Sequence, residues 1–250
     1  MLLGSKVAVI SGAAGVRGIG FATARLFAEH GARIAIVDLN ESAAQDAARE
    51  LGPDHRGFAC DVTDHESCRR AAGRALEAFG QVDILINNAG ITQPLKLMEI
   101  TGEHWDAVLD VNLKGVFNLS QALVPHMRER RRGSIVCMSS VSAQRGGGIF
   151  GGPHYSAAKA GVLGLAKAMA REFGADGIRV NCVTPGLIQT DITGGKLTDD
   201  MRREILKGIP LARLGDAADV AGAYLFLASD LSAYITGAVI DVNGGMLIHG

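Results

Sequence analysis

The feature that most constrains the fold is an alternation of short apolar runs with longer amphipathic stretches along the whole chain. The apolar runs have the length of strands and cover residues 6–10, 33–37, 57–60, 83–86, 134–138, 178–183 and 238–241. Most of them are continuously apolar, which is typical of strands that are covered on both faces, as in parallel sheets. The stretches between them have helical spacing and cover residues 18–30, 41–51, 64–79, 102–131, 154–174 and 216–228.

This strand–helix repetition predicts an α/β fold with right-handed crossovers. We expect a doubly wound (Rossmann) parallel sheet of about seven strands, flanked by helices. No Pro/Ser-rich linker, charge block or shift in composition divides the chain, so residues 1–250 are predicted to form a single domain. Helix starts are predicted at Asn40, Thr63 and Thr101, whose side chains are suited to capping.

The composition argues against several classes of protein. The chain has 25 Lys and Arg residues against 26 Asp and Glu residues, so it lacks the basic excess that nucleic acid or an anionic membrane surface attracts. The four cysteines have no paired spacing, which indicates neither a metal site nor a disulfide framework. The first residues do not resemble a signal peptide, and no apolar run is long enough to span a membrane. We therefore expect a soluble, cytoplasmic protein.

A glycine-rich segment follows the first predicted strand and leads directly into a helix. It runs from Ser11 to Gly20 and places Gly12, Gly18 and Ile19 where a tight turn meets the helix start. Backbone N–H groups at such a turn bind phosphate oxygens, and the helix dipole adds to the attraction. The second strand ends in Asp38, 20 residues after Gly18, where a carboxylate is expected to meet the adenosine ribose of a dinucleotide.

Two residues of opposite charge bear on the choice between NAD and NADP. Asp38 repels a 2′-phosphate and favours NAD, whereas Arg17 could pair with that phosphate and favour NADP. A carboxylate placed directly on the ribose outweighs one flexible arginine at the rim, because like charges in contact cost several kcal/mol. NAD is therefore the predicted cofactor, and NADP is less favoured.

Small or polar residues follow several other strands, and these strand ends share one edge of a parallel sheet, where such sheets bind ligands. Asp61 and Val62 follow the third strand, and Asp61 is placed to accept a hydrogen bond from adenine. The fourth strand is followed by the sequence Asn87–Gly90, which contains Asn88, Ala89 and Gly90, and the sixth strand ends in Pro185 and Gly186.

The strongest chemical signal is the pair Tyr155 and Lys159 at the start of a helical stretch. Residues four positions apart lie on one helix face, so we expect the ammonium to stabilise the phenolate and lower the tyrosine pKa. Ser140 ends the fifth strand at the ligand edge, and Asn112 lies inside a helical stretch, where its intrinsic preference does not place it.

Together these motifs make the whole chain similar to the short-chain dehydrogenase/reductase family. The resemblance implies a catalytic tetrad of Asn112, Ser140, Tyr155 and Lys159, with no metal. Tyr155 would be the general base in alcohol oxidation, Ser140 would bind the substrate oxygen, Lys159 would hold the nicotinamide ribose, and Asn112 would anchor a water. It also implies that Ile188 and Thr190 hold the cofactor's carboxamide.

Two loops are longer than is common in that family. Five residues separate Gly12 from Gly18, and the segment between Ser140 and Tyr155 is two residues longer and glycine-rich. A surface loop absorbs such additions without moving the strand or helix ends, so the catalytic assignments are kept.

The predicted substrate pocket is formed by residues 92–97, 142–154 and 187–207, the last being a long insertion suited to a lid. Its polar character favours a polyol, sugar or hydroxy-acid over a steroid. Candidate substrate contacts are Ser140, Gln144, Arg145, His154 and Gln189.

Three functions remain open from the sequence. The first is an NAD-dependent oxidoreductase that interconverts a secondary alcohol and its carbonyl. The second is an NADPH-dependent reductase of 3-oxoacyl chains on acyl carrier protein, favoured by Arg17 and by the cluster Arg128–Arg132, and disfavoured by Asp38 and Asp176. The third is a non-catalytic dinucleotide-binding sensor, disfavoured by the intact tetrad. The resemblance further implies a homotetramer that pairs the helices near 102–131 and 154–174.

Overall fold

The computed structural model describes residues 1–147, 150–190 and 197–249. In this part of the chain the strands form one parallel seven-stranded sheet in the order β3-β2-β1-β4-β5-β6-β7. The strands are β1 (Val7–Ser11), β2 (Arg33–Asp38), β3 (Arg56–Ala59), β4 (Ile84–Asn87), β5 (Gly133–Met138), β6 (Ile178–Pro185) and β7 (Val239–Val242). The predicted fold class is confirmed, and every predicted strand is present with its ends shifted by no more than two residues.

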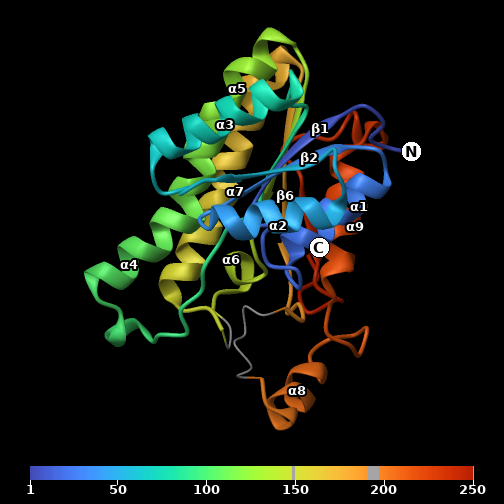
Figure 1. Cartoon of the computed structure of the whole chain (residues 1–250). Helices are drawn as coiled ribbons and strands as arrows, with labels where there is room; N and C mark the ends of the chain where they lie inside the picture. The colour runs from blue at the N-terminus through green and yellow to red at the C-terminus, as the bar shows by residue number, and fades with distance from the viewer. Residues whose placement is uncertain (148–149, 191–196, 250) are drawn as a thin grey trace.

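Helices cover both faces of the sheet (Figure 1). They are α1 (Ile19–Glu29), α2 (Glu41–Leu51), α3 (His65–Phe79), α4 (Gly102–Leu109), α5 (Gly115–Glu129), α6 (Ser142–Arg145), α7 (Pro153–Phe173), α8 (Asp199–Leu206) and α9 (Ala217–Ala228). One buried apolar cluster joins the sheet to α3, α5 and α7, and a second joins it to α1, α2 and α9. This two-sided burial explains why the strands are continuously apolar.

The helix predicted over 102–131 is interrupted. It consists of α4, a π-helical turn Asp110–Lys114 and α5. The extra residue of a π turn rotates the side chains that follow, and such turns are frequent at functional sites. The same turn carries Asn112, so the residue with poor helix preference marks the interruption.

Two of the three predicted helix starts are confirmed. The side chain of Asn40 accepts a hydrogen bond from Ala43 N, and that of Thr101 accepts one from His104 N. The prediction for Thr63 is wrong by one residue, because the Asp64 carboxylate caps α3 through Glu66 N and Ser67 N. A carboxylate has two acceptor oxygens, so it satisfies two free N–H groups where a hydroxyl serves one.

The order of strands reverses direction between β1 and β4, which pair directly through Ala8 and Ile84. At this point the crossovers leave on opposite faces and open a crevice beyond the carboxyl ends of the strands. The short helix α6 lies at this end of the sheet, and α8 lies farther out, apart from the main body (Figure 1).

Candidate active site

A cleft of about 760 Å³ lies at the carboxyl ends of the strands. Its volume is within the range of small-molecule and cofactor sites. All four residues of the predicted tetrad line it: Asn112, Ser140, Tyr155 and Lys159. It is also lined by most of the predicted cofactor contacts, namely Gly12, Gly18, Ile19, Asp38, Asp61, Val62, Asn88, Ala89, Gly90, Pro185, Gly186, Ile188 and Thr190.

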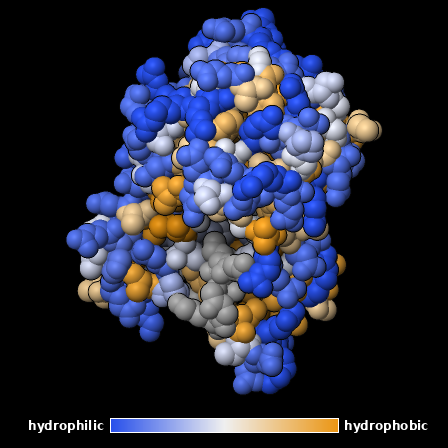
Figure 2. All heavy atoms as spheres, viewed as in Figure 1, coloured by the Kyte–Doolittle hydropathy of each residue, from blue (hydrophilic) through white to orange (hydrophobic). Residues whose placement is uncertain are grey.

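On the face shown in Figure 2, apolar side chains gather on both sides of the lower middle of the molecule, among polar surroundings. Of the predicted substrate contacts, Ser140 and Arg145 line the cleft. Phe150, which lies within the predicted pocket wall 142–154, also lines it, as does Met246, which no local pattern marked in the sequence. Met246 comes from the end of the chain, and only the folded sheet brings it to the site.

Four predicted site residues are not among those that line the cleft: Arg17, Gln144, His154 and Gln189. Arg17 is exposed on the glycine-rich loop. Gln144 donates to Asp241 of β7 (Nε2–Oδ1, 3.0 Å), and Gln189 donates to Asp216 (Nε2–Oδ1, 3.2 Å). Their amides are used in contacts between elements, which sequence position alone does not reveal.

His154 is fully buried, although it precedes Tyr155 in the sequence. Its Nε2 atom lies 3.1 Å from Gln93 Oε1, and burial lowers the pKa of the imidazole. A side chain without exposed surface does not reach a substrate. His154 instead ties the start of α7 to the segment that follows β4.

The glycine-rich loop is held tightly against the segment after β4. Gly12 has a φ of +64°, and a Cβ atom there would lie 2.7 Å from the Cα of Ala89. The Asn88 side chain donates to the carbonyl oxygens of Ser11 and Gly12, both at 3.0 Å. The Ser11 hydroxyl accepts from the backbone N–H groups of Asn88 and Ala89. Asn88 therefore shapes the loop, a role that the sequence did not indicate.

Two carboxylates lie at the end of the cleft formed by β2 and β3. Asp38 Oδ2 accepts a hydrogen bond from the backbone N–H of Ala14 at 3.1 Å, which fixes the carboxylate beside the glycine-rich loop. Asp61 Oδ1 accepts from the backbone N–H of Thr63 at 2.9 Å and from its hydroxyl at 2.7 Å. Both carboxylates are thus held where an adenosine is expected in this fold.

Tyr155 and Ser140 form the polar centre of the cleft. Burial raises the pKa of the Tyr155 phenol, and its hydrogen bond with Ser140 acts in the opposite direction. The prediction that this pKa is lowered is therefore wrong for the structure: desolvation of the phenolate outweighs the groups that stabilise it. Lys159 Nζ lies 5.8 Å from the centre of the Tyr155 ring.

Lys159 is buried, and its Nζ atom donates to the carbonyl oxygen of Met138 at 3.0 Å. Burial lowers the pKa of this ammonium to about 8. The Ser139 hydroxyl donates to the Lys159 carbonyl at 2.8 Å and so joins the end of β5 to α7. These contacts fix the lysine at the floor of the cleft.

Asn112 is buried in the π turn, and its amide donates to the carbonyl oxygens of Ile91 and Val108, both at 2.9 Å. Its Oδ1 atom is buried without a hydrogen-bond partner among the described residues. A Cβ atom on Gly90 would lie 2.8 Å from this oxygen and 3.4 Å from Lys159 Nζ. The acceptor and the ammonium therefore face the same small space, which only a glycine at position 90 leaves open.

The described residues contain no group of three or more His, Cys, Asp or Glu side chains placed to hold a metal ion. Within the same residues, none of the helices combines the length and the apolar character that crossing a bilayer requires. Part of the predicted pocket wall, residues 148–149 and 191–196, lies outside the described residues.

The sheet order and the cleft at its switch point define a Rossmann-type α/β protein. The family model described as "Enoyl-(Acyl carrier protein) reductase" matches residues 12–247. An uncharacterized short-chain type dehydrogenase/reductase, y4mP, from Sinorhizobium fredii is 69% identical, with full coverage of both chains. The 3-oxoacyl-[acyl-carrier-protein] reductase FabG of Escherichia coli is 44% identical over 96% of this chain and 97% of its own.

The crystal structure of gox2181 superposes with a TM-score of 0.92 at 35% identity, covering 98% of this chain and 96% of that one. The chain therefore belongs to the short-chain dehydrogenase/reductase family, as its motifs predicted. It is an oxidoreductase of a family that binds NAD or NADP.

Proposed function

We propose that the protein is an NAD-dependent oxidoreductase that interconverts a secondary alcohol and its carbonyl. The observation that carries the proposal is one cleft that joins a half-buried Tyr155 and its hydrogen-bond partner Ser140 to a fixed carboxylate, Asp38. The Tyr155–Ser140 pair can transfer a proton to and from a substrate oxygen. The Asp38 carboxylate can accept hydrogen bonds from a ribose whose hydroxyl groups are free.

The residues of the cleft divide the chemistry between them. Tyr155 accepts the hydroxyl proton during oxidation and returns it during reduction, while Ser140 donates a hydrogen bond to the substrate oxygen. Lys159 and the free Oδ1 atom of Asn112 hold the route by which a proton reaches solvent. When bound, NAD supplies the hydride acceptor or donor. The lining fits such a cofactor, because glycines at positions 12, 15 and 18 present backbone and no side chains to the cleft beside Asp38, where a dinucleotide phosphate would lie.

A second candidate function is reduction of 3-oxoacyl chains on acyl carrier protein, the activity for which the FabG relatives are named. Asp38 disfavours this activity, because it requires NADPH and the Asp38 carboxylate repels the 2′-phosphate of that cofactor. The basic cluster Arg128–Arg132 at the end of α5 also forms ion pairs: Arg128 pairs with Asp176 at 2.7 Å, and Arg130 pairs with the buried Asp83 at 2.9 Å. These contacts leave less positive charge for an acidic carrier. A non-catalytic sensor is disfavoured because it would not need the Tyr155–Ser140 pair.

The test is to titrate NADH and NADPH separately against the purified protein and to follow nicotinamide fluorescence. We expect NADH to bind more tightly, and we expect Asp38→Ala to reduce this preference by about tenfold or more, because it removes the charge that repels a 2′-phosphate. Tyr155→Phe tests the proton-transfer step, because it removes only the phenolic hydroxyl. This variant should keep NADH binding and lower turnover by about 100-fold or more.

Tighter binding of NADPH than of NADH would reject the cofactor assignment and direct the work to 3-oxoacyl substrates. A preference for NADH that is unchanged in Asp38→Ala would reject the role assigned to Asp38. Turnover retained by Tyr155→Phe would remove Tyr155 from its role.

We further propose that the enzyme acts as a homotetramer in the cytoplasm. The exposed side chains of α7 include small residues at helical spacing, namely Ala157, Ala160, Gly164 and Ala168. Phe117 on α5 and Trp105 on α4 are also partly exposed. All four cysteines are free and buried, which is consistent with a reducing compartment.

A further inference from the structure

Arg145 is the last residue of α6, the short helix that follows Ser140. It lines the same cleft as Ser140 and Tyr155. Among the contacts between described residues, its guanidinium has neither an acceptor nor a carboxylate partner. An arginine on an open surface is commonly solvated in this way, but Arg145 belongs to a cleft wall and its backbone is held in place.

The backbone of Arg145 is fixed on both sides. Its N–H donates to the Val141 carbonyl at 3.0 Å, and Gly147 N, two residues later, donates to the Ser156 hydroxyl at 2.8 Å, beside Tyr155. Gly146 and Gly147 turn the chain back towards α7 with φ values of +73° and +62°. The side chain therefore starts from a defined point between the ends of the two elements that carry Ser140 and Tyr155.

Two hydrogen bonds made by other residues of α6 support this position of Arg145. The adjacent residue, Gln144, donates to Asp241 of β7 and so turns away from the cleft. The Ser140 hydroxyl accepts from Ser142 N at 3.1 Å, which links the first turn of α6 to the polar centre of the site. Arg145 is thus the member of this helix whose charge is directed to the cleft.

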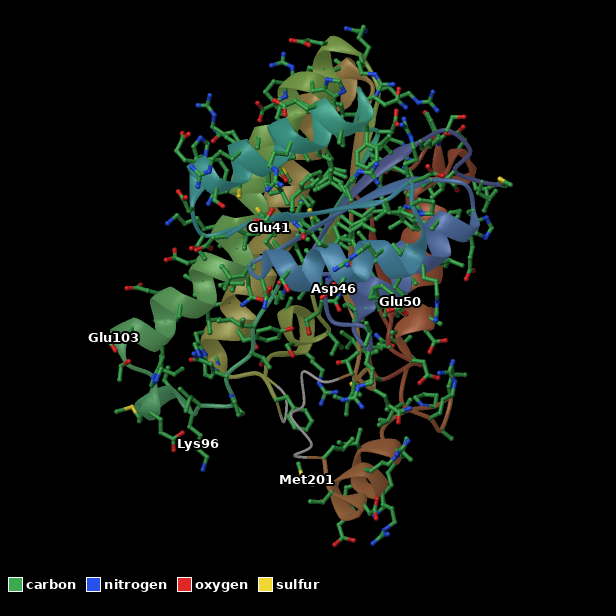
Figure 3. All side chains as sticks on the ribbon, in the orientation of Figure 1. Glu41, Asp46, Glu50, Lys96, Glu103 and Met201 are labelled. Atoms are coloured by element: carbon green, nitrogen blue, oxygen red, sulfur yellow. The ribbon has the colours of Figure 1, made fainter. Side chains whose placement is uncertain are left out.

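Other charged groups near the cleft have hydrogen-bond partners among the described residues. Glu204 of α8 also lines the cleft, but Lys207 Nζ lies 2.5 Å from one of its carboxylate oxygens. Arg202 donates to the Gln189 amide oxygen at 2.9 Å. Lys96, labelled at the lower left of Figure 3, is not among the residues that line the cleft. Within the described part of the chain, Arg145 therefore supplies a positive charge without a carboxylate partner to the wall of the cleft, whereas the ammonium of Lys159 is buried at the floor and donates to the Met138 carbonyl.

The cleft that Arg145 lines has a mainly apolar surface. Its apolar lining residues include Ile91, Phe150, Leu187, Ile205 and Met246. A sugar or polyol would leave its hydroxyl groups facing these side chains without partners, which costs free energy. A small molecule with one anionic group and an apolar body matches both features.

We propose that Arg145 binds the carboxylate of the substrate, and that the substrates are short hydroxy acids and the corresponding oxo acids. This inference rests on the proposed function, and it selects one of the substrate classes that the sequence left open. The planar guanidinium donates two parallel hydrogen bonds to a carboxylate. A single guanidinium matches one negative charge, whereas a phosphate dianion is ordinarily met by several donors.

The test compares short 2-oxo and 3-oxo acids with their methyl esters, which keep the carbonyl and remove the charge. Binding is followed through the fluorescence of bound NADH, and reduction is followed through its oxidation. We expect wild-type protein to favour the acid over its ester. Arg145→Gln should weaken acid binding by about 10- to 100-fold and so reduce the ratio of acid affinity to ester affinity. Arg145→Lys should retain part of the preference for the acid. Arg25→Gln, an exposed arginine of α1, is the matched control and should keep the ratio.

Equal binding of acid and ester to wild-type protein would overturn the inference, as would an acid preference that survives Arg145→Gln. Either result leaves the proposed function standing if carbonyls are still reduced. Acid-selective binding lost in Arg145→Gln but unaccompanied by any reduction would support the carboxylate site and reject the proposed reaction.

Discussion

At the scale of single residues, the cleft holds an ammonium group that is almost fully buried. Lys159 is 2% exposed, and its described hydrogen bond goes to a backbone carbonyl and not to a carboxylate. Burial without an opposite charge disfavours the charged form, which is why the pKa of the ammonium falls to about 8. The folded protein therefore binds this proton less tightly than the unfolded chain, whose lysine titrates near 10.5.

Lys159→Met is expected to stabilise the cofactor-free protein at pH 7, because it keeps the packing volume and removes the buried charge. Below about pH 8 both states of the wild-type protein are protonated, and the cost of the charge is constant. Between about pH 8 and pH 10.5 the unfolded state binds more protons, so the wild-type protein gains stability as the pH rises. The advantage of the variant should fall from about 3 kcal/mol at pH 7 to about 1 kcal/mol at pH 10.

Urea unfolding at the two pH values measures this difference, and Lys167→Met, an exposed lysine of the same helix, is the control. A variant that is destabilised by the same amount at both pH values would show that the Met138 hydrogen bond matters more than the buried charge.

The pKa of Tyr155 shows what sequence spacing does and does not determine at this scale. The spacing of Tyr155 and Lys159 correctly placed both side chains at one cleft. It did not show that the phenol is buried, and burial changes the direction of the pKa shift. The same limit applies to His154, whose neighbour Tyr155 lines the cleft while the imidazole packs against Gln93. Burial depends on elements that are distant in sequence.

At the scale of elements, the glycine-rich loop and the start of α1 pack closely enough to exclude any side chain. A Cβ atom on Gly20 would lie 2.6 Å from the Gly12 carbonyl oxygen and 2.7 Å from Asn88 Nδ2. These atoms belong to the hydrogen-bonded contact between the loop and the segment after β4. A substitution at position 20 must therefore move the loop.

Gly20→Ala is expected to lower the free energy of unfolding by about 1–3 kcal/mol, as overpacking does elsewhere. Gly15→Ala is the matched change, because Gly15 lies in the same loop and a Cβ atom there would meet nothing within 4 Å. Melting temperatures of the two variants should therefore separate, with Gly20→Ala lower than wild type and Gly15→Ala close to it. Equal melting temperatures would show that the loop yields without cost.

Elements differ in how far the sequence determines them. The seven strands followed from apolar runs, because burial on both faces of a sheet leaves a continuous pattern. Helix α8 was not predicted, and its described residues include none that are fully buried, so no apolar stripe marks it. The π turn before α5 was also missed, because its side chains follow the helical pattern on both sides.

At the scale of the whole molecule, the two faces of the sheet are covered, but part of α7 is not. The helix packs Val162, Ala166 and Met169 into the core that it shares with α3 and α5. Gly164, on a different side of α7, is exposed, and a Cβ atom there meets nothing within 4 Å. A small-residue helix face allows the backbones of two helices to approach closely, which fits the proposed pairing of subunits.

Gly164→Arg should fit the monomer and disrupt the assembly, because the side chain enters space that the isolated chain leaves open. Light scattering after size exclusion should give the wild-type protein about four times the 26.1 kDa chain mass, and the variant a half or a quarter of that value. Gly73→Arg makes the same change on α3, where a Cβ atom also meets nothing within 4 Å, and should retain the wild-type mass. If Gly164→Arg keeps the full mass, α7 is not the contact between subunits. If the wild-type protein itself has the mass of one chain, the tetramer is rejected and the exposed face of α7 requires another explanation.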